Sequence, residues 1–183
     1  EKLAVVGQNG AGKTTLTKLL LRLYDPTAGS ISLDGKDIRD VELTSYRDLF
    51  ATVLQDYRRF SMSVKSNILL RREQDGDDAV VADALRKSTA DSFVDAFPNG
   101  ADSILDREFD DNGEVLSGGQ AQMISIAHVH AKGSPIVILD EPSSALDPIA
   151  EQKMYENMMA SAEGKTVVFI SHRMSACTLA DRI

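Results

Sequence analysis

The stretch GQNGAGKT, Gly7 to Thr14, follows the apolar run Leu3–Val6 and precedes four regularly spaced leucines, Leu16, Leu19, Leu20 and Leu23. The apolar run predicts a buried strand, and the i, i+3, i+4, i+7 leucine spacing predicts an amphipathic helix that Asp25-Pro26 ends. A GxxxxGK[ST] turn between a strand and a helix is a phosphate-binding loop, because its glycines let consecutive N–H groups point at a phosphate near a positive helix end. We therefore expect an α/β fold built on a P-loop.

The loop supplies the first group of candidate ligands. Lys13 is expected to bridge the β- and γ-phosphates of a nucleotide, and Thr14 to offer its hydroxyl to Mg²⁺. A glycine-rich turn with an exposed lysine is the alternative, and the strand–turn–helix context disfavours it. The residues expected to contact nucleotide are Gln8, Asn9, Gly10, Ala11, Gly12, Lys13, Thr14 and Thr15.

Two acidic residues follow the apolar run Ile136–Leu139. At the end of a buried strand, Asp140 is expected to hold Mg²⁺ through water. Glu141, one residue further and pointing differently, is expected to reach the attacking water as a general base. A strand that merely ends in two solvated acids is the alternative, and the P-loop upstream disfavours it.

Composition limits the class of protein. The 183 residues suffice for one domain, with 43% hydrophobic and 26% charged residues, which is typical of a globular protein. A formal charge of -8 disfavours a nucleic-acid partner, since such domains present a basic face. The single Cys177 cannot form an internal disulfide and is expected to be buried. No run approaches the ~18 apolar residues of a membrane span.

Apolar strands alternate with helical patterns along the chain. Strands are expected at Phe50–Leu54, Pro135–Leu139 and Thr166–Ile170, a helix at 148–160, and a tight hairpin in SISLDGKDI around Asp34-Gly35. This order predicts a P-loop NTPase fold, a mainly parallel sheet flanked by helices. Residues 56–132 carry longer helical patterns and predict an inserted α-helical subdomain, which leaves a core at about 1–55 and 133–183.

Six motifs together resemble the nucleotide-binding domain of ABC transporters. GQNGAGKT looks like Walker A, VLQD like the Q-loop, LSGGQ like the family signature, VILDEP like Walker B, SALD like the D-loop, and Ser171-His172 like the switch histidine. Their order is the family's, and they cover nearly the whole chain. DYRRFSMSVKSNI and RLYDPTAGSISLDG resemble the exporter type. Both ends look truncated, and the adenine-stacking aromatic residue of the family is expected upstream of Walker A.

The resemblance implies an ATPase that uses Mg²⁺ and dimerises head to tail. Gln55 would touch Mg²⁺ and the attacking water, and His172 the γ-phosphate. The signature residues expected to meet the nucleotide of the facing domain are Ser117, Gly118, Gly119 and Gln120, and Asp147 of the D-loop is also expected to bind nucleotide. Independently, a serine and bare N–H groups at the start of an apolar helix form an anion site, although Ser117 can equally be a simple N-cap. Both readings are compatible.

The implied partners are a second ABC ATPase domain and a transmembrane domain, fused or separate, which would hold the chain at the cytoplasmic face of the plasma (inner) membrane. The chain departs from the family after the signature: Ala121, Met123 and Ala127-His128-Val129 stand where a basic residue, an arginine and Ala-Arg-Ala are usual. Asp111 stands near the usual glutamate of exporters. The missing cations predict lower turnover.

Two other functions stay open at this point. One is an ATP-binding regulatory domain with weak hydrolysis, which the missing cations favour and which Glu141, His172 and the intact signature disfavour. The other is a soluble ABC-type ATPase that acts on ribosomes or DNA. That class usually carries tandem domains or a long coiled coil, and the sequence has neither these nor a basic face.

Overall fold

The computed structural model describes residues 1–8, 10–54, 59–142, 148–161, 164–171 and 177–183. Contacts between residues divide the chain into two compact units. The first, here called the sheet unit, comprises Glu1–Thr52, Ser134–Glu141 and Gly164–Ile183. The second, the helical unit, comprises Val53–Gly133 and Pro142–Glu163.

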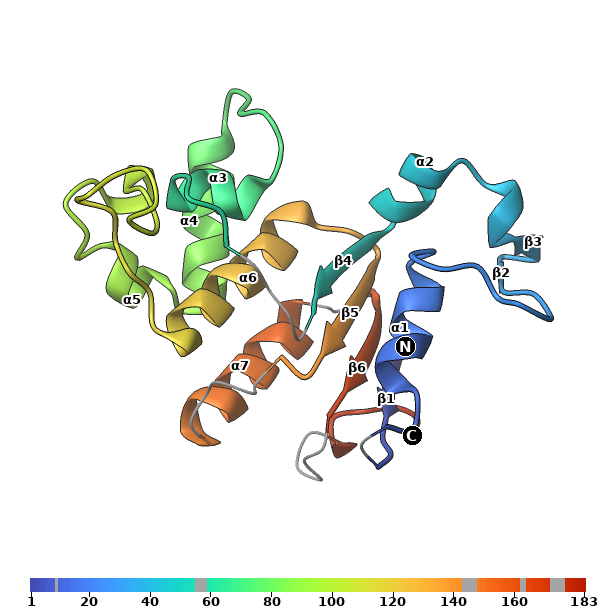
Figure 1. Cartoon of the computed structure of the whole chain (residues 1–183). Helices are drawn as coiled ribbons and strands as arrows, with labels where there is room; N and C mark the ends of the chain where they lie inside the picture. The colour runs from blue at the N-terminus through green and yellow to red at the C-terminus, as the bar shows by residue number, and fades with distance from the viewer. Residues whose placement is uncertain (9, 55–58, 143–147, 162–163, 172–176) are drawn as a thin grey trace. The chain divides into compact units, whose positions relative to one another are not determined.

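The sheet has four strands in the order β1 (Lys2–Val5), β6 (Thr166–Ile170), β5 (Ile136–Asp140) and β4 (Phe50–Val53), as Figure 1 shows. β6 pairs in parallel with both β1 and β5. The interior strands β5 and β6 are mostly apolar, and most of their side chains are buried, as expected for strands covered on both faces. The predicted mainly parallel sheet is confirmed.

The first helix, α1 (Lys13–Leu20), ends earlier than the leucine spacing predicted. Arg22 adopts a left-handed φ of 49°, and the Leu23 N–H donates to the Lys18 carbonyl at 2.9 Å, which closes the helix end. The Arg22 guanidinium holds this turn by donating to the Ile38 and Val41 carbonyls, both at 2.7 Å. Leu23 therefore lies outside the helix that the spacing predicted, and both Leu16 and Leu23 are exposed.

A short hairpin follows α1. β2 (Ser32–Leu33) and β3 (Lys36–Asp37) pair antiparallel, and Asp34 and Gly35 both have positive φ, 50° and 80°. This is the conformation that an Asp-Gly hairpin requires, so the predicted turn is confirmed. The 3₁₀ turn η1 (Ile38–Asp40) and helix α2 (Leu43–Asp48) lead from the hairpin to β4. Two backbone N–H groups at the start of α2 donate to the Glu42 carboxylate, which lowers its pKa to about 2.

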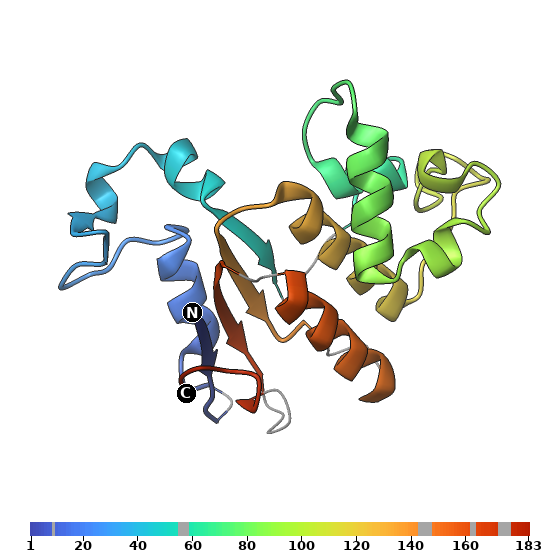
Figure 2. The ribbon, with the colours of Figure 1, turned by 180° about the vertical axis from the view of Figure 1, so that it is seen from behind.

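The two ends of the described chain lie side by side in Figures 1 and 2. The Lys2 N–H donates to the Asp181 carboxylate at 2.7 Å, and the Ala4 N–H donates to the Arg182 carbonyl at 2.9 Å. Cys177 is buried, as predicted. Residues 181–182 thus extend the pairing of β1 on its free side.

The helical unit contains α3 (Val64–Leu69), α4 (Asp77–Ser88), α5 (Asp91–Val94), η2 (Gly100–Asp102), α6 (Gly118–Lys132) and α7 (Pro148–Ser161). α6 packs against α3 and α4, and Figure 2 shows α4 and α6 in contact. The core between them is built from side chains spaced three or four apart on each helix: Val64, Ile68, Val81, Leu85, Ile124 and Ala127. α7 contacts α4 in the same unit.

The segment between η2 and α6 folds back on itself. The Asp106 N–H donates to the Glu114 carbonyl at 2.9 Å, and the Glu114 N–H donates to the Ile104 carbonyl at 2.8 Å. Gly113 lies inside this turn, where a Cβ would be 1.9 Å from the Asp106 carbonyl oxygen. Only a residue without a side chain fits there.

Replacing Gly113 by alanine is therefore expected to force the backbone apart and to lower the free energy of unfolding by about 1–3 kcal/mol. Urea unfolding measures this change. The adjacent Asn112→Ala, in the same turn but exposed, is the control and is expected to stay within about 0.5 kcal/mol of the parent. Equal stability of the two variants would show that the turn does not need glycine.

Candidate functional site

The parallel register aligns the carboxyl ends of three strands. Val5 of β1 pairs with Ile170 of β6, and Ile170 also pairs with Asp140 of β5. The chain leaves β1 at this level into the glycine loop, and leaves β5 at this level into Glu141. Segments more than 130 residues apart in the sequence thus meet at one edge of the sheet, where ligands bind in open parallel α/β sheets.

The loop after β1 has the backbone geometry of an anion cradle. Gly10 and Gly12 have φ of 81° and 94°, and Gly12 is the N-cap of α1 without a side-chain cap. The first N–H groups of the helix are therefore left to an anion or to water. The Lys13 ammonium turns back across the loop and donates to the Gly7 and Gln8 carbonyls at 2.9 and 3.0 Å. A cation at the centre of the loop complements a bound phosphate.

Asp140 is the most unusual polar group of the sheet unit. Its side chain is 1% exposed, and neither carboxylate oxygen has a hydrogen-bond partner among the described residues. Burial raises its pKa above the usual range for aspartate. Two neighbours lower the pKa of Asp140 and so offset part of this rise. One is the Thr14 hydroxyl, which lies near the carboxylate without well-formed hydrogen-bond geometry, and the other is the Lys13 charge.

This pair of groups fits Mg²⁺. A hydroxyl and a carboxylate are hard oxygen ligands, and P-loop sites complete the shell of Mg²⁺ with phosphate oxygens and water. No group of three or more His, Cys, Asp and Glu side chains with metal-binding geometry occurs among the described residues. That finding is compatible with a site in which the protein supplies only Thr14 and Asp140.

Glu141 follows Asp140 with a left-handed φ of 52°, which is rare for a residue with a long side chain. Its N–H donates to the Ile170 carbonyl at 3.1 Å and so continues the strand pairing by one step. Such strained residues concentrate at functional sites.

The signature segment begins helix α6 in the helical unit. Ser117 is the N-cap, its Oγ accepts from the Gln120 N–H at 3.2 Å, and the Gln120 Oε1 accepts from the Ser117 N–H at 2.9 Å. Ser117 and Gly118 are exposed, and Gly119 is half-buried. Because the Ser117 oxygen acts as an acceptor inside the chain, its hydroxyl proton stays available to a ligand. The side-chain carbonyl of Gln120, in contrast, is already bonded to the Ser117 N–H in the cap.

Four of the predicted site residues, Asn9, Gln55, Asp147 and His172, lie outside the described residues. Thr15 is exposed in the first turn of α1, and Ala11 is exposed in the loop. The structure thus brings the P-loop, Asp140 and Glu141 to one sheet edge. It describes Ser117 to Gln120 in the other unit.

The positions that depart from the family lie along α6. Ala121 is buried in the core of the helical unit, and Met123 packs partly against that core and accepts from the Thr89 hydroxyl at 3.9 Å. The His128 Nδ1 lies 2.8 Å from the Ile68 carbonyl of α3, and burial lowers the pKa of this histidine. His128 is thus a link between two helices, a role that its helical position in the sequence did not indicate.

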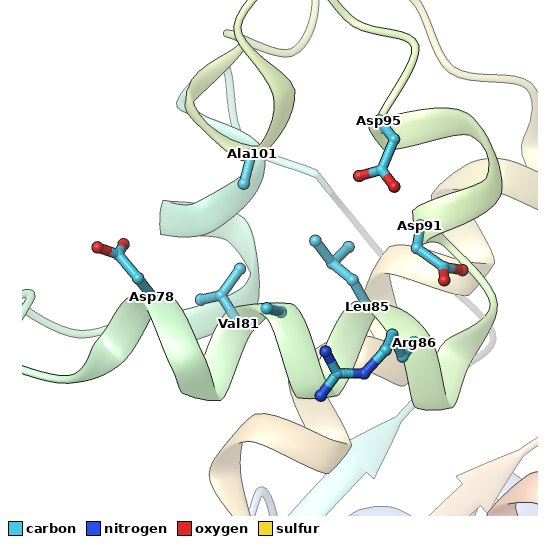
Figure 3. Close-up of a pocket in the computed structure, with 8 residues that line it drawn as sticks. Asp78, Val81, Leu85, Arg86, Asp91, Asp95 and Ala101 are labelled. Carbon is cyan, nitrogen blue, oxygen red and sulfur yellow. The ribbon is translucent and has the colours of Figure 1, made fainter.

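A pocket of about 350 Å³ lies beside α4 and is separate from all of these residues. Its lining combines apolar side chains with Asp78, Arg86, Asp91 and Asp95 (Figure 3). None of the predicted site residues lines it. Three carboxylates against one guanidinium disfavour a nucleotide phosphate, so we do not place the nucleotide there.

The glycine loop between strand and helix, with an acidic residue ending a parallel strand at the same edge, defines a P-loop nucleotide-binding protein. The family model described as "ABC transporter" matches residues 1–144. The chain belongs to the ABC transporter family.

The similar proteins are transporters. The chain is 40% identical to an ATP-dependent lipid A-core flippase of Thiobacillus denitrificans and 40% identical to the putative multidrug export ATP-binding/permease protein YgaD of Bacillus subtilis, in each case over all of this chain and 31% of the relative. A bacterial Atm1-family ABC exporter with ATP bound superposes with a TM-score of 0.88 and 36% identity, over 98% of this chain and 31% of that one. The chain thus spans about 30% of the length of these relatives. Within the described part, no helix is both long and apolar enough to cross a membrane.

The isolated Asp140 carboxylate leads to a stability prediction. Without Mg²⁺ and nucleotide, Asp140→Asn is expected to raise the free energy of unfolding at neutral pH by on the order of 1 kcal/mol, because it removes a buried charge without a partner. That corresponds to roughly 2–4 °C in Tm. The folded-state pKa of Asp140 is raised, so the advantage of the variant should shrink as the pH falls through that pKa.

Thermal unfolding across pH measures the effect. Asp37→Asn is the control, because the pKa of Asp37 is shifted in the opposite direction from that of Asp140. The Arg39 side chain holds the pKa of Asp37 at about 2, so its carboxylate stabilises the fold above the pKa of the unfolded state, and the variant should gain nothing at neutral pH. A less stable Asp140→Asn would mean that the carboxylate already has a stabilising partner in the protein.

Proposed function

We propose that this chain is the ATP-binding and hydrolysing domain of an ABC exporter, and that it works as a head-to-tail dimer that couples hydrolysis to transport. The observation that carries the proposal is the buried Asp140 carboxylate, without a hydrogen bond in the described structure, beside Thr14 and level with the glycine loop. A buried charge of this kind is costly unless a ligand compensates it. The names of the relatives, a flippase and a multidrug exporter, support export.

In this proposal, the residues at the sheet edge have separate roles in ATP hydrolysis. The Lys13 ammonium would exchange its two loop carbonyls for β- and γ-phosphate oxygens, and the N–H groups of α1 would hold the same phosphates. Thr14 and Asp140, with Gln55, would hold Mg²⁺, which when bound draws charge from the phosphates. Glu141 would accept a proton as the water oxygen attacks the γ-phosphorus and the bond to ADP breaks. His172 would contact the γ-phosphate.

The signature serves the nucleotide of the facing domain in this proposal. Ser117 would donate its hydroxyl proton, and Gly118 and Gly119 their N–H groups, to the γ-phosphate across the dimer, with Asp147 beside it. The partners are a second ABC ATPase domain and a transmembrane domain, fused or separate. They would keep the chain at the cytoplasmic face of the plasma (inner) membrane.

A regulatory domain that binds ATP and hydrolyses it weakly is the second candidate. One observation favours it: the three positions where the family usually carries cations hold Ala121, Met123 and His128, and these side chains pack inside the helical unit or bind its backbone. They supply no positive charge to a nucleotide. Turnover of the parent protein with Mg²⁺ and ATP separates this candidate from the first.

Glu141→Gln is expected to lower ATP turnover by on the order of 10²-fold or more and to leave ATP binding intact, since the amide cannot accept the proton. Phosphate release measures turnover, and equilibrium binding of a fluorescent ATP analogue measures affinity. Asp75→Asn, an exposed acid remote from the sheet edge in sequence, is the control and should keep both values. Equal turnover of parent and Glu141→Gln would remove Glu141 from the role of base.

Ser117→Asp tests the signature separately from its structural role. Aspartate caps a helix about as well as serine, so the helical unit should keep its stability, whereas the new charge repels the phosphate of the facing domain. Hydrolysis is expected to be lost while ATP binding to the monomer persists. Ser45→Asp, exposed in the first turn of α2, adds the same charge at another helix start, so it is the control and should keep hydrolysis. Loss of ATP binding in monomeric Ser117→Asp would contradict the head-to-tail arrangement.

A further inference from the structure

Asn67 is a fully buried polar side chain in the helical unit, 0% exposed among apolar neighbours on α3. Its Oδ1 accepts from the Phe60 N–H at 2.8 Å. Its Nδ2 donates to the carbonyls of Phe60, Met62 and Ser63 at 2.9, 3.2 and 3.0 Å. Three carbonyls around one nitrogen fix the orientation of the amide. One side chain thus bonds the backbone of three of the four residues Phe60–Ser63.

This segment, Phe60–Ser63, is not held by burial of its own side chains. Phe60 is 51% exposed and Met62 is 40% exposed, although both are large and apolar. Apolar burial therefore contributes little to holding this segment in place, and the hydrogen bonds of Asn67 hold it instead. The segment begins five residues after Gln55 in the sequence.

The held segment is the first link of a continuous ladder. The Leu105 N–H donates to the Met62 carbonyl at 2.9 Å, and the Val64 N–H donates to the Ser103 carbonyl at 3.0 Å. The strand-like stretch 103–105 pairs next with Glu114, through the Glu114 N–H and the Ile104 carbonyl at 2.8 Å. Three residues after Glu114, following the buried Leu116, the chain reaches the Ser117 cap.

We propose that Asn67 is a positioning residue: its amide fixes Phe60–Ser63, and through the ladder at Leu105 and Glu114 it fixes the approach to Ser117. It sets turnover without touching nucleotide. The role in turnover rests on the proposed function, whereas the ladder stands on the hydrogen bonds alone.

Amide hydrogen exchange of the chain tests the ladder directly. Asn67→Leu keeps the size of the side chain and removes all four hydrogen bonds. The Phe60, Leu105 and Glu114 amides are then expected to exchange at least about 10-fold faster, while amides in the middle of α4 keep the parent rate. Asp77→Asn is the control, because it weakens the Arg71 pair at the start of α4 and lies off the ladder.

Steady-state hydrolysis by the purified full-length protein tests the consequence. Asn67→Leu is expected to lower kcat by on the order of 10-fold with KM for ATP within about twofold, since a displaced signature acts on the transition state and not on the chain's own ATP. Asp77→Asn should keep kcat within about twofold of the parent.

Asn67→Asp separates positioning from simple loss of stability. The introduced carboxyl retains the acceptor for the Phe60 N–H, but when ionised it faces three carbonyl oxygens, and when protonated it regains one donor. Its kcat relative to the parent should therefore rise as the pH falls from about 8.5 to about 6, because burial favours the neutral acid. Asn67→Leu should show no such recovery.

Several results would overturn the proposal: parent-like exchange at Leu105 and Glu114 in Asn67→Leu, parent-like kcat in that variant, an equal loss of kcat in Asp77→Asn, or a flat pH ratio for Asn67→Asp. If the parent protein hydrolysed no ATP, the proposed function would fail, and the exchange rates would still decide whether Asn67 controls the approach to Ser117.

Discussion

The parallel pairing of β1, β6 and β5 is the constraint on which the rest of the sheet unit depends. Val5, Ile170 and Asp140 stand level across three strands, so the glycine loop, Glu141 and the end of β6 leave the sheet at one edge. Parallel strands need covering crossovers on both faces, and this explains the apolar runs Ile136–Leu139 of β5 and Val167–Ile170 of β6. A shift of one residue in the pairing of β5 with β6 would turn Asp140 to the other face of the sheet.

Two residues at this edge of the sheet have features that lower the stability of the fold. Asp140 has a buried carboxylate without a hydrogen bond in the described structure, and Glu141 has a left-handed backbone. Both features oppose stability, and both lie where the site for phosphate and metal is expected. The Thr14 hydroxyl and the Lys13 charge offset part of the cost. A buried carboxylate without a hydrogen bond and a left-handed backbone are features that concentrate at functional sites.

The helical unit places its functional segment by hydrogen bonds. The reciprocal cap of Ser117 and Gln120 fixes the first turn of α6, yet Ser117 and Gly118 stay exposed. In the proposed function, Ser117 combines a structural cap with an anion site. Farther along α6, Ala121 packs in the core and the His128 Nδ1 lies at the Ile68 carbonyl. Positions where the family usually carries cations thus make contacts within the helical unit in this chain.

The sequence by itself determined the strands β1, β5 and β6, the Asp34-Gly35 hairpin, the P-loop context and the order of the motifs, because each depends on local periodicity or on turn residues. Only the tertiary structure decided the early end of α1, which depends on Arg22 reaching carbonyls 16 and 19 residues away. It alone revealed the isolation of Asp140, the Asn67 ladder and the His128 link. The physical reason is that desolvation and hydrogen bonding at these groups come from partners distant in the sequence, which no local pattern records.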